Sequence, residues 1–188
     1  MIGGADILDG NFLLSYVPKD EYSEIGYHKT LYIKLDNIKE TGFIPSNNKD
    51  DWLGQGVYFW DNIENAKWWN VSTGSIIKTC IITCELKCNS SQYLDLDKEI
   101  DNLDKFSRKY INGLIRKGLP RPKFENANQK KKFFCDLYCT QNNFIILSYT
   151  FKHDIMNCAG FKIGTKSRRQ ICVRNPKYIQ ILSVIGGD

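Results

Sequence analysis

The sequence lacks the features that mark several common classes of protein. No apolar run approaches the roughly 18 to 20 residues that cross a bilayer, and the N-terminus lacks the basic-then-apolar pattern of a secretion signal. Only two of the 188 residues are histidine, and no pattern of His, Cys and acidic residues resembles a metal cage or a Ser/His/Asp catalytic set. We therefore expect a soluble, cytoplasmic protein that holds no metal and does not bind a membrane.

The cysteines do not predict a disulfide scaffold. Seven is an odd number, so they cannot all pair within one chain, and the chain is far longer than a small stapled domain. Cys80, Cys84 and Cys88 recur every four residues, whereas structural zinc sites usually contain the tighter Cys-x-x-Cys pair. Buried, reduced thiols that act as small apolar side chains are the favoured interpretation.

The composition, 25 % charged and 42 % hydrophobic, fits one globular domain. No repeat, low-complexity tract or Gly/Ser linker divides the chain. Residues 1–26 are interpreted as an N-terminal extension, and residues 27–188 as a single domain.

The formal net charge of +5 conceals a strong asymmetry. Residues 1–103, the acidic half, carry 9 Lys/Arg and 16 Asp/Glu, whereas residues 104–188, the basic half, carry 17 and 5. Clustered Lys and Arg side chains release counterions when they meet phosphates, so the basic half favours a polyanionic partner. An ordinary solvated surface, on which the two halves pair with each other, is the alternative interpretation.

Hydrophobic patterning predicts more strands than helices. Segments rich in β-forming residues predict strands over 27–33, 57–60, 75–86, 93–96, 143–151, 169–173 and 179–185. Apolar residues spaced three and four apart predict helices near 35–41 and 62–69 and over 97–117 and 131–141. Because the strands do not alternate regularly with helices, we expect an α+β fold with a mainly antiparallel sheet.

Two segments carry side chains suited to a flat ligand that contains a sugar. His28 lies in a predicted strand, where a ring nitrogen can hydrogen-bond a hydroxyl. Tyr58 follows Gly54 and Gly56 and offers a ring for stacking. No Lys-Ser/Thr follows the glycines, as a P-loop requires, and the third glycine of a dinucleotide fingerprint is missing. A hydrogen-bonded structural histidine and an ordinary hairpin are the alternative interpretations.

Several motifs together resemble a known family. YHKT at 27–30, GFIPS at 42–46, WLGQGVYFW at 52–60, NAKWW at 65–69 and RRQICVRNPKYI at 168–179 occur in that order. This order resembles the ADP-ribosyltransferase catalytic domain of the diphtheria-toxin and poly(ADP-ribose) polymerase type, especially its small bacterial and phage-linked members. The resemblance covers residues 27–70 and 168–182. It implies two small, mainly antiparallel sheets, flanked by helices, with NAD in a cleft between them.

The resemblance also implies which residues bind NAD. His28, Lys29 and Thr30 match the family's His-Gly-Thr/Ser strand, in which the histidine hydrogen-bonds the adenosine ribose. The backbone of Lys29 would hold the nicotinamide amide. Tyr58 would stack on the nicotinamide ring, and Trp69 matches the position of a second aromatic residue that would clamp the ring from the other side.

Two positions depart from the family pattern. The glycine that usually follows the histidine is Lys29, which places a long side chain near the mouth of the expected pocket. The catalytic set would be His28, Tyr58 and Gln170, with Gln170 in place of the family's glutamate. A glutamine can hold the ribose 2′-hydroxyl, but it supplies no negative charge and takes no proton. Transfer of a single ADP-ribose, or loss of activity, therefore fits better than synthesis of a polymer.

Other residues near these motifs are candidates for supporting roles. A carboxylate elsewhere could replace the missing glutamate, the candidates being Glu64, Glu125 and Asp136. Arginines beside Gln170 could contact the NAD pyrophosphate or phosphates of an acceptor, the candidates being Arg168, Arg169 and Arg174.

The sequence thus favours a mono-ADP-ribosyltransferase that uses NAD as co-substrate. Its acceptor would be a macromolecule, with RNA or DNA favoured over protein by the basic half, and its role that of a toxin or defence effector. The alternatives are a non-enzymatic nucleic-acid-binding protein, which would use the basic segment 121–132, and a catalytically inactive relative that binds NAD.

Overall fold

The computed structural model describes residues 20–69, 78–158 and 161–186, which form four α-helices and seven strands. The strands are β1 Glu21–Leu31, β2 Val57–Trp60, β3 Thr79–Asn89, β4 Tyr93–Asp95, β5 Ile146–Cys158, β6 Phe161–Val173 and β7 Ile179–Ile185. The helices are α1 Leu35–Thr41, α2 Ile63–Trp68, α3 Leu96–Arg116 and α4 Ala127–Asn142. None of these helices is long and apolar enough to cross a membrane.

The strands form one sheet in the order β4-β5-β6-β2-β1-β3-β7. Every neighbouring pair is antiparallel except β4 and β5, which are parallel. The predicted combination of helices with a mainly antiparallel sheet is confirmed. Two separate sheets with an NAD cleft between them are not confirmed, because the described strands are hydrogen-bonded into a single sheet.

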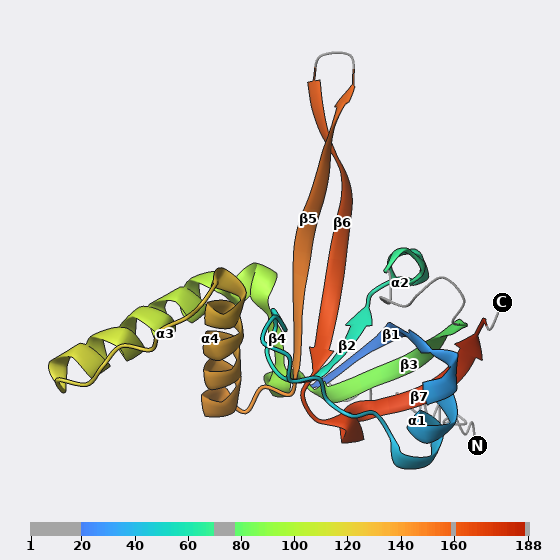
Figure 1. Ribbon diagram of the computed structural model, residues 1–188, viewed down its shortest axis with the longest axis horizontal. Helices are drawn as coiled ribbons and strands as arrows, with labels where there is room; N and C mark the ends of the chain where they lie inside the picture. The colour runs from blue at the N-terminus through green and yellow to red at the C-terminus, as the bar shows by residue number, and fades with distance from the viewer. Residues whose placement is uncertain (1–19, 70–77, 159–160, 187–188) are drawn as a thin grey trace, which may run out of the picture.

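The sheet is nearly divided between β1 and β2. These strands pair at one register position, where Tyr27 lies opposite Trp60. In contrast, all four residues of β2 pair with the end of β6, and β1 pairs with β3 along its whole length. Figure 1 shows the long β5-β6 hairpin rising steeply from the plane in which β1, β3 and β7 run. We call the contact between β1 and β2 the junction, because among the described strands it is the backbone pairing that joins the two parts of the sheet.

Gly26 allows the close approach that the junction needs. A Cβ atom at this position would lie 2.7 Å from Leu86 Cδ1 and 2.9 Å from Phe59 Cβ, closer than carbon atoms pack. The strand that contains Gly26 begins at Glu21 rather than at Tyr27, where the sequence predicts it. Its first residues alternate between exposed and half-buried positions. Of the two inward side chains, Tyr22 packs against the core but Glu24 is charged, so one aromatic residue was too weak a signal for a strand. Residues 1–19 of the expected extension lie outside the described residues.

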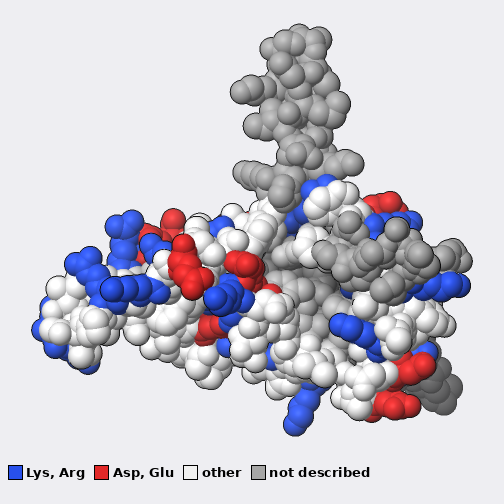
Figure 2. All heavy atoms as spheres, viewed as in Figure 1, with Lys and Arg blue, Asp and Glu red and all other residues white. Residues whose placement is uncertain are grey.

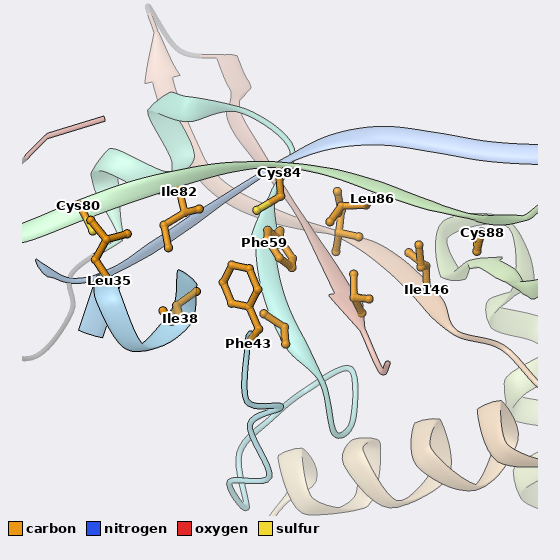
Figure 3. Packing of buried hydrophobic residues seen from close by; sticks show 13 residues of the cluster. Leu35, Ile38, Phe43, Phe59, Cys80, Ile82, Cys84, Leu86, Cys88 and Ile146 are labelled. Atoms are coloured by element: carbon orange, nitrogen blue, oxygen red, sulfur yellow. The ribbon is translucent and has the colours of Figure 1, made fainter. Parts of the chain in front are cut away.

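One core packs on the face of the sheet that α1 covers (Figure 3). It joins Leu35 and Ile38 of α1 to Phe43, Phe59 and the inward side chains of β3. A second core lies on the other face, where Cys135 and Cys139 of α4 pack with the buried Leu53, Leu94, Leu96, Leu147 and Cys172.

The cysteines contribute to both cores as the sequence predicts. The six whose side chains are described are free and buried. Burial raises the pKa of the Cys84 and Cys135 thiols to about 12, so they stay protonated and behave as apolar groups. Among residues 20–69, 78–158 and 161–186, no group of three or more His, Cys, Asp or Glu residues is arranged to hold a metal.

The two long helices lie beside β4 and β5 (Figure 1). The helix predicted over 97–117 is α3. Asp95 caps its N-terminus, since the Asp95 side chain accepts a hydrogen bond from the amide of Asp97. The predicted helix 131–141 begins earlier, as α4, because Asn126 accepts a hydrogen bond from the amide of Gln129. Part of the basic segment 121–132, predicted as a loop, is therefore helical.

Adding one methyl group at the junction tests its packing. We expect Gly26→Ala to lower the free energy of unfolding by about 1 to 3 kcal/mol, because the Phe59 Cβ atom moves only with its backbone and the buried Leu86 side chain is enclosed by the core. Gly113→Ala is the matched control, since its Cβ would meet nothing within 4 Å on α3. That change should raise stability by about 0.5 to 1 kcal/mol. Urea unfolding measures both, and equal effects of the two changes would contradict the close packing at Gly26.

Candidate functional site

The segments that carry the family resemblance meet at the junction. Tyr27 of β1 lies opposite Trp60 of β2, Trp60 opposite Gln170 of β6, and Gln170 opposite Tyr149 of β5. Residues directly opposite one another on antiparallel strands point to the same face and lie about 5 Å apart. The motifs at 27–30, 54–60 and 168–173 are thus brought together on three neighbouring strands, although more than a hundred residues separate the last from the others.

His28 bridges the gap that opens between β1 and β2 beyond the junction. Its Nδ1 lies 2.8 Å from the carbonyl oxygen of Tyr58. A carbonyl can only accept a hydrogen bond, so Nδ1 carries the proton. Burial lowers the pKa of His28 below its ordinary value of 6.5, which keeps the ring neutral at physiological pH. Nε2 therefore has a free lone pair that can accept a hydrogen bond from a hydroxyl.

The ring of His28 packs against two aromatic neighbours. Its centroid lies 5.2 Å from that of Phe43, nearly edge-on, and 5.7 Å from that of Phe59. Phe59 and Tyr58 are consecutive in β2 and point to opposite faces of the sheet. The structure therefore places the His28 ring beside Phe59, on the face of β2 opposite the Tyr58 ring.

The Tyr58 hydroxyl is fully engaged within the chain. It accepts a hydrogen bond from the amide of Leu53 at 3.0 Å and donates one to the carbonyl oxygen of Gly54 at 2.7 Å. Burial raises the pKa of this hydroxyl, so it remains protonated. A ligand can therefore contact only the ring of Tyr58, and the phenol is not available to donate or take a proton.

Asp136 of α4 holds the glycine-rich segment before β2. Gly54 has a φ of +92°, and a Cβ there would lie 2.4 Å from Asp136 Oδ1. The carboxylate accepts hydrogen bonds from the Gln55 amide at 2.7 Å, Lys132 Nζ at 2.7 Å and Arg174 Nη1 at 2.6 Å. Burial raises the pKa of Asp136, but these bonds outweigh it and hold the pKa below its ordinary range. Asp136 is thus an anchor rather than a free base.

The other two candidate carboxylates are exposed. Glu64 pairs with Lys67 within α2 at 2.9 Å, and Glu125 pairs with Lys49 at 3.4 Å. Sequence reasoning did not find the anchoring role of Asp136, because the contact joins residues far apart in the chain and no local motif signals it.

Lys29, which replaces the family's glycine, is held at the end of α2. Its Nζ donates a hydrogen bond to the carbonyl oxygen of Lys67 at 3.0 Å. A cation at this end of a helix is favourable, because the last carbonyl groups carry partial negative charge. Thr30, two residues after His28, is buried and lies opposite Cys80 of β3, so its side chain is shielded from solvent.

Aromatic side chains gather around the end of α2. The Trp60 ring lies 5.7 Å from that of Trp69 and 6.3 Å from that of Trp68. Trp69 is 44 % exposed, so much of its ring is accessible. The residue that it contacts, Trp60, lies two positions after Tyr58 and therefore on the same face of β2. The Arg168 guanidinium lies 3.2 Å from the Trp68 ring centroid.

Gln170 is half-buried beside this cluster. Among the described residues, none hydrogen-bonds to its side-chain amide. Arg168 lies two residues away on the same face of β6 and is only 5 % exposed, yet its Nε has no hydrogen-bond partner. Both side chains thus bring unused polar atoms to the same part of the sheet.

The two other candidate arginines are already paired. Arg169 points to the opposite face, where it binds Glu24 and donates to the Tyr93 hydroxyl at 2.8 Å and to Ser148 Oγ at 3.0 Å. Arg174 is paired with Asp136. Of the three arginines, only Arg168 therefore lies where it could serve a ligand beside Gln170.

Comparison with models of known protein families finds none that matches this chain, and comparison with curated proteins finds no significant match. The interpretation of the site therefore depends on its own residues and on the resemblance of their motifs.

The neutral state of His28 has a measurable consequence for stability. Below about pH 6.5 the unfolded chain takes up a proton that the buried ring resists, so the free energy of unfolding should fall as the pH falls. One such group contributes at most about 1.4 kcal/mol per pH unit. We expect His28→Gln to reduce this slope, measured by urea unfolding between about pH 5 and about pH 8. The other histidine, His153, is present in both proteins, so its contribution cancels when the two slopes are compared. An unchanged slope would overturn the assignment of a neutral, buried His28.

Proposed function

We propose that this protein is a mono-ADP-ribosyltransferase that uses NAD as co-substrate. The observation that carries the proposal is the row formed by Tyr27, Trp60 and Gln170 across β1, β2 and β6. Each of these residues belongs to a different motif of the family resemblance. Tyr27 precedes His28, Trp60 lies two positions after Tyr58, and Gln170 is itself the counterpart of the family's glutamate. Chance similarity of separate short motifs gives no reason for them to meet on adjacent strands.

The hydrogen-bonding state of His28 supports a role in binding ribose. Its Nδ1–H is fixed by the Tyr58 carbonyl, so Nε2 is an acceptor suited to a ribose hydroxyl. Beyond Tyr27, β1 no longer pairs with β2. Unpaired backbone groups at a strand edge are available to a ligand, which suits the proposed contact between the Lys29 backbone and the nicotinamide amide. The Lys29 side chain is engaged at the end of α2 and does not need to occupy that edge.

The aromatic residues would hold the nicotinamide. In this proposal the ring stacks on Tyr58, whose hydroxyl is committed to the 53–54 backbone, and the accessible Trp69 supplies a second face. Because the His28 and Tyr58 rings lie on opposite faces of β2, NAD would have to pass through the point where β1 and β2 diverge. The two ends of the dinucleotide would then contact different faces of the sheet.

Gln170 limits the chemistry that the site can perform. The bond between C1′ of the ribose and the nicotinamide nitrogen breaks, and its electron pair leaves with the nicotinamide, which becomes neutral. A lone pair on an acceptor oxygen or nitrogen forms the new bond to C1′, and the acceptor's proton passes to water. The Gln170 amide can orient the 2′-hydroxyl during this step, but it adds no charge to stabilise the cationic sugar.

An inactive relative that binds NAD is the second candidate. It is favoured by Gln170 itself and by the engagement of Asp136, since neither residue offers a free carboxylate. The two candidates differ in one observable, because only the transferase releases nicotinamide when it is incubated with NAD.

Binding of NAD tests the proposed roles of His28 and Tyr58. We expect His28→Ala to weaken NAD binding about tenfold in calorimetry, because one hydrogen bond to ribose is lost. Tyr58→Phe keeps the ring and should leave the affinity for NAD nearly unchanged. It should lower the free energy of unfolding by about 1 to 3 kcal/mol, because the Leu53 amide and the Gly54 carbonyl lose their hydrogen-bond partner. If the unaltered protein neither binds NAD nor releases nicotinamide with any cell extract, the enzymatic proposal fails.

Restoring the family's carboxylate tests the role of Gln170. We expect Gln170→Glu to raise the rate of nicotinamide release by about 10- to 100-fold, because a negative charge stabilises the cationic sugar in the transition state. Gln180→Glu on β7 is the matched control, an identical change at an exposed position outside the site. Equal rates for the two variants would show that position 170 does not face the reacting sugar.

A further inference from the structure

A cavity of about 780 Å³ lies between α3, α4, β5 and the segment that precedes Gly54. We call it the α3–α4 groove. Its floor is apolar and includes Leu53, Leu96 and Phe134. Three aromatic side chains, Trp52, Phe151 and Tyr149, line one wall. The ring centroids of Trp52 and Phe151 lie 4.6 Å apart, and those of Phe151 and Tyr149 lie 4.8 Å apart.

The groove begins beside the proposed reaction site. Tyr149, which lines the groove, lies directly opposite Gln170 in the pairing of β5 with β6. Opposite residues of neighbouring strands are separated by only about 5 Å. A molecule in the groove could therefore present a reactive atom to a sugar held at Gln170 without any movement of the strands.

The rim of the groove is basic. Lys130 and Lys131 of α4 and Arg108 of α3 line it, and Lys131 Nζ lies 5.6 Å from the centroid of Trp52. Asp104, the one acidic residue among those that line the cavity, pairs with Arg108, so the excess positive charge of the rim comes from Lys130 and Lys131. Figure 2 shows Lys and Arg side chains gathered over the part of the molecule that α3 forms. Lys105, Lys109 and Arg116 of α3 line a second, shallow hollow.

We propose that the α3–α4 groove binds the acceptor of the transfer reaction, and that this acceptor is a single-stranded nucleic acid. The inference rests on the proposed function. Unpaired bases expose flat faces that stack on aromatic side chains, and their phosphates match a basic rim. A duplex hides those faces. An acidic peptide would match the charge of the rim, but the Asp and Glu side chains that supply its charge have no ring to place against Trp52 and Phe151, whereas every nucleotide carries both a phosphate and a ring.

The volume of the groove agrees with this assignment. At about 780 Å³, the groove falls within the range of about 300 to 1,000 Å³ that is usual for small-molecule sites. A site of this size suits one nucleotide and part of the next. In the transfer, a base or ribose oxygen or nitrogen forms the bond to C1′ of NAD as nicotinamide leaves with the electron pair, and the acceptor's proton passes to water.

Binding without NAD tests the groove separately from catalysis. Fluorescence anisotropy with single-stranded RNA and DNA of about 12 nucleotides should detect binding that weakens with salt and exceeds binding of a matched duplex. We expect Trp52→Ala to weaken it at least tenfold, because one stacked base is lost. Lys131→Ala, an exposed change that does not threaten folding, should reduce the salt slope by about 0.7.

Two matched controls lie outside the groove. Tyr32→Ala removes an exposed aromatic ring, and Lys39→Ala removes an exposed cation of α1, so neither should change binding. If Trp52→Ala and Lys131→Ala also bind like the unaltered protein, the groove is not the nucleic-acid site and the inference is wrong.

Incubation with labelled NAD separates this inference from the proposed function. Label in single-stranded RNA or DNA, lost with Trp52→Ala, would support both. Label in a protein fraction alone would refute a nucleic-acid acceptor and leave the transferase standing. Binding of oligonucleotides by a protein that does not bind NAD would refute the acceptor role together with the proposed function.

Discussion

The architecture depends on one close contact between two strands. β1 and β2 pair at a single position, where Tyr27 meets Trp60, and Gly26 permits this approach because it has no side chain. On one side of the contact β1 continues with β3 and β7, and on the other β2 continues with β6, β5 and β4. Beyond this contact the two strands no longer pair, so the side chain of His28 can donate a hydrogen bond to the Tyr58 carbonyl in place of a backbone amide. The same contact therefore joins the two parts of the sheet and leaves the rest of β1 beside β2 without a ladder partner on that side.

The uneven charge of the chain acquires a spatial meaning from this arrangement. The acidic half supplies β1, β2, β3 and the first part of α3, whereas the basic half supplies the rest of α3, together with α4, β5, β6 and β7. Its cations have two distinct uses. Arg169 and Arg174 form partly buried ion pairs that fix β6 and the glycine-rich segment, while Lys130 and Lys131 remain at the edge of the groove. Counting charges along the sequence does not separate these uses, because only tertiary contacts decide which cations are neutralised.

The sequence predicted the elements better than their assembly. The three- and four-residue spacing of apolar side chains indicated α3, and β-forming runs indicated most strands, because each pattern is local. The early start of β1 was missed because the inward Glu24 interrupts the hydrophobic pattern, and its burial depends on a distant contact with Arg169 and on a hydrogen bond from the Tyr22 hydroxyl. The early start of α4 depends on the Asn126 cap within a segment whose lysines suggested a loop. The motifs around His28, Tyr58 and Gln170 lie on the adjacent strands β1, β2 and β6, but the His28 ring faces the side of the sheet opposite Tyr58 and Gln170. The hydrogen bond from His28 to the Tyr58 carbonyl joins a side chain to a backbone group, which no residue pattern encodes.

Lys29 links two parts of the molecule that a glycine at the same position could not connect. α2 has six residues, too few to be stable as an isolated helix. It is held by the Asn62 cap at its start and by the Lys29 ammonium at its end. The orientation of Trp68 and Trp69, at the end of α2, is therefore set in part by a residue of β1. In evolutionary terms, position 29 and the length of α2 should covary among related chains, and a return to glycine at position 29 should be accompanied by a new partner for the carbonyl that Lys29 now satisfies.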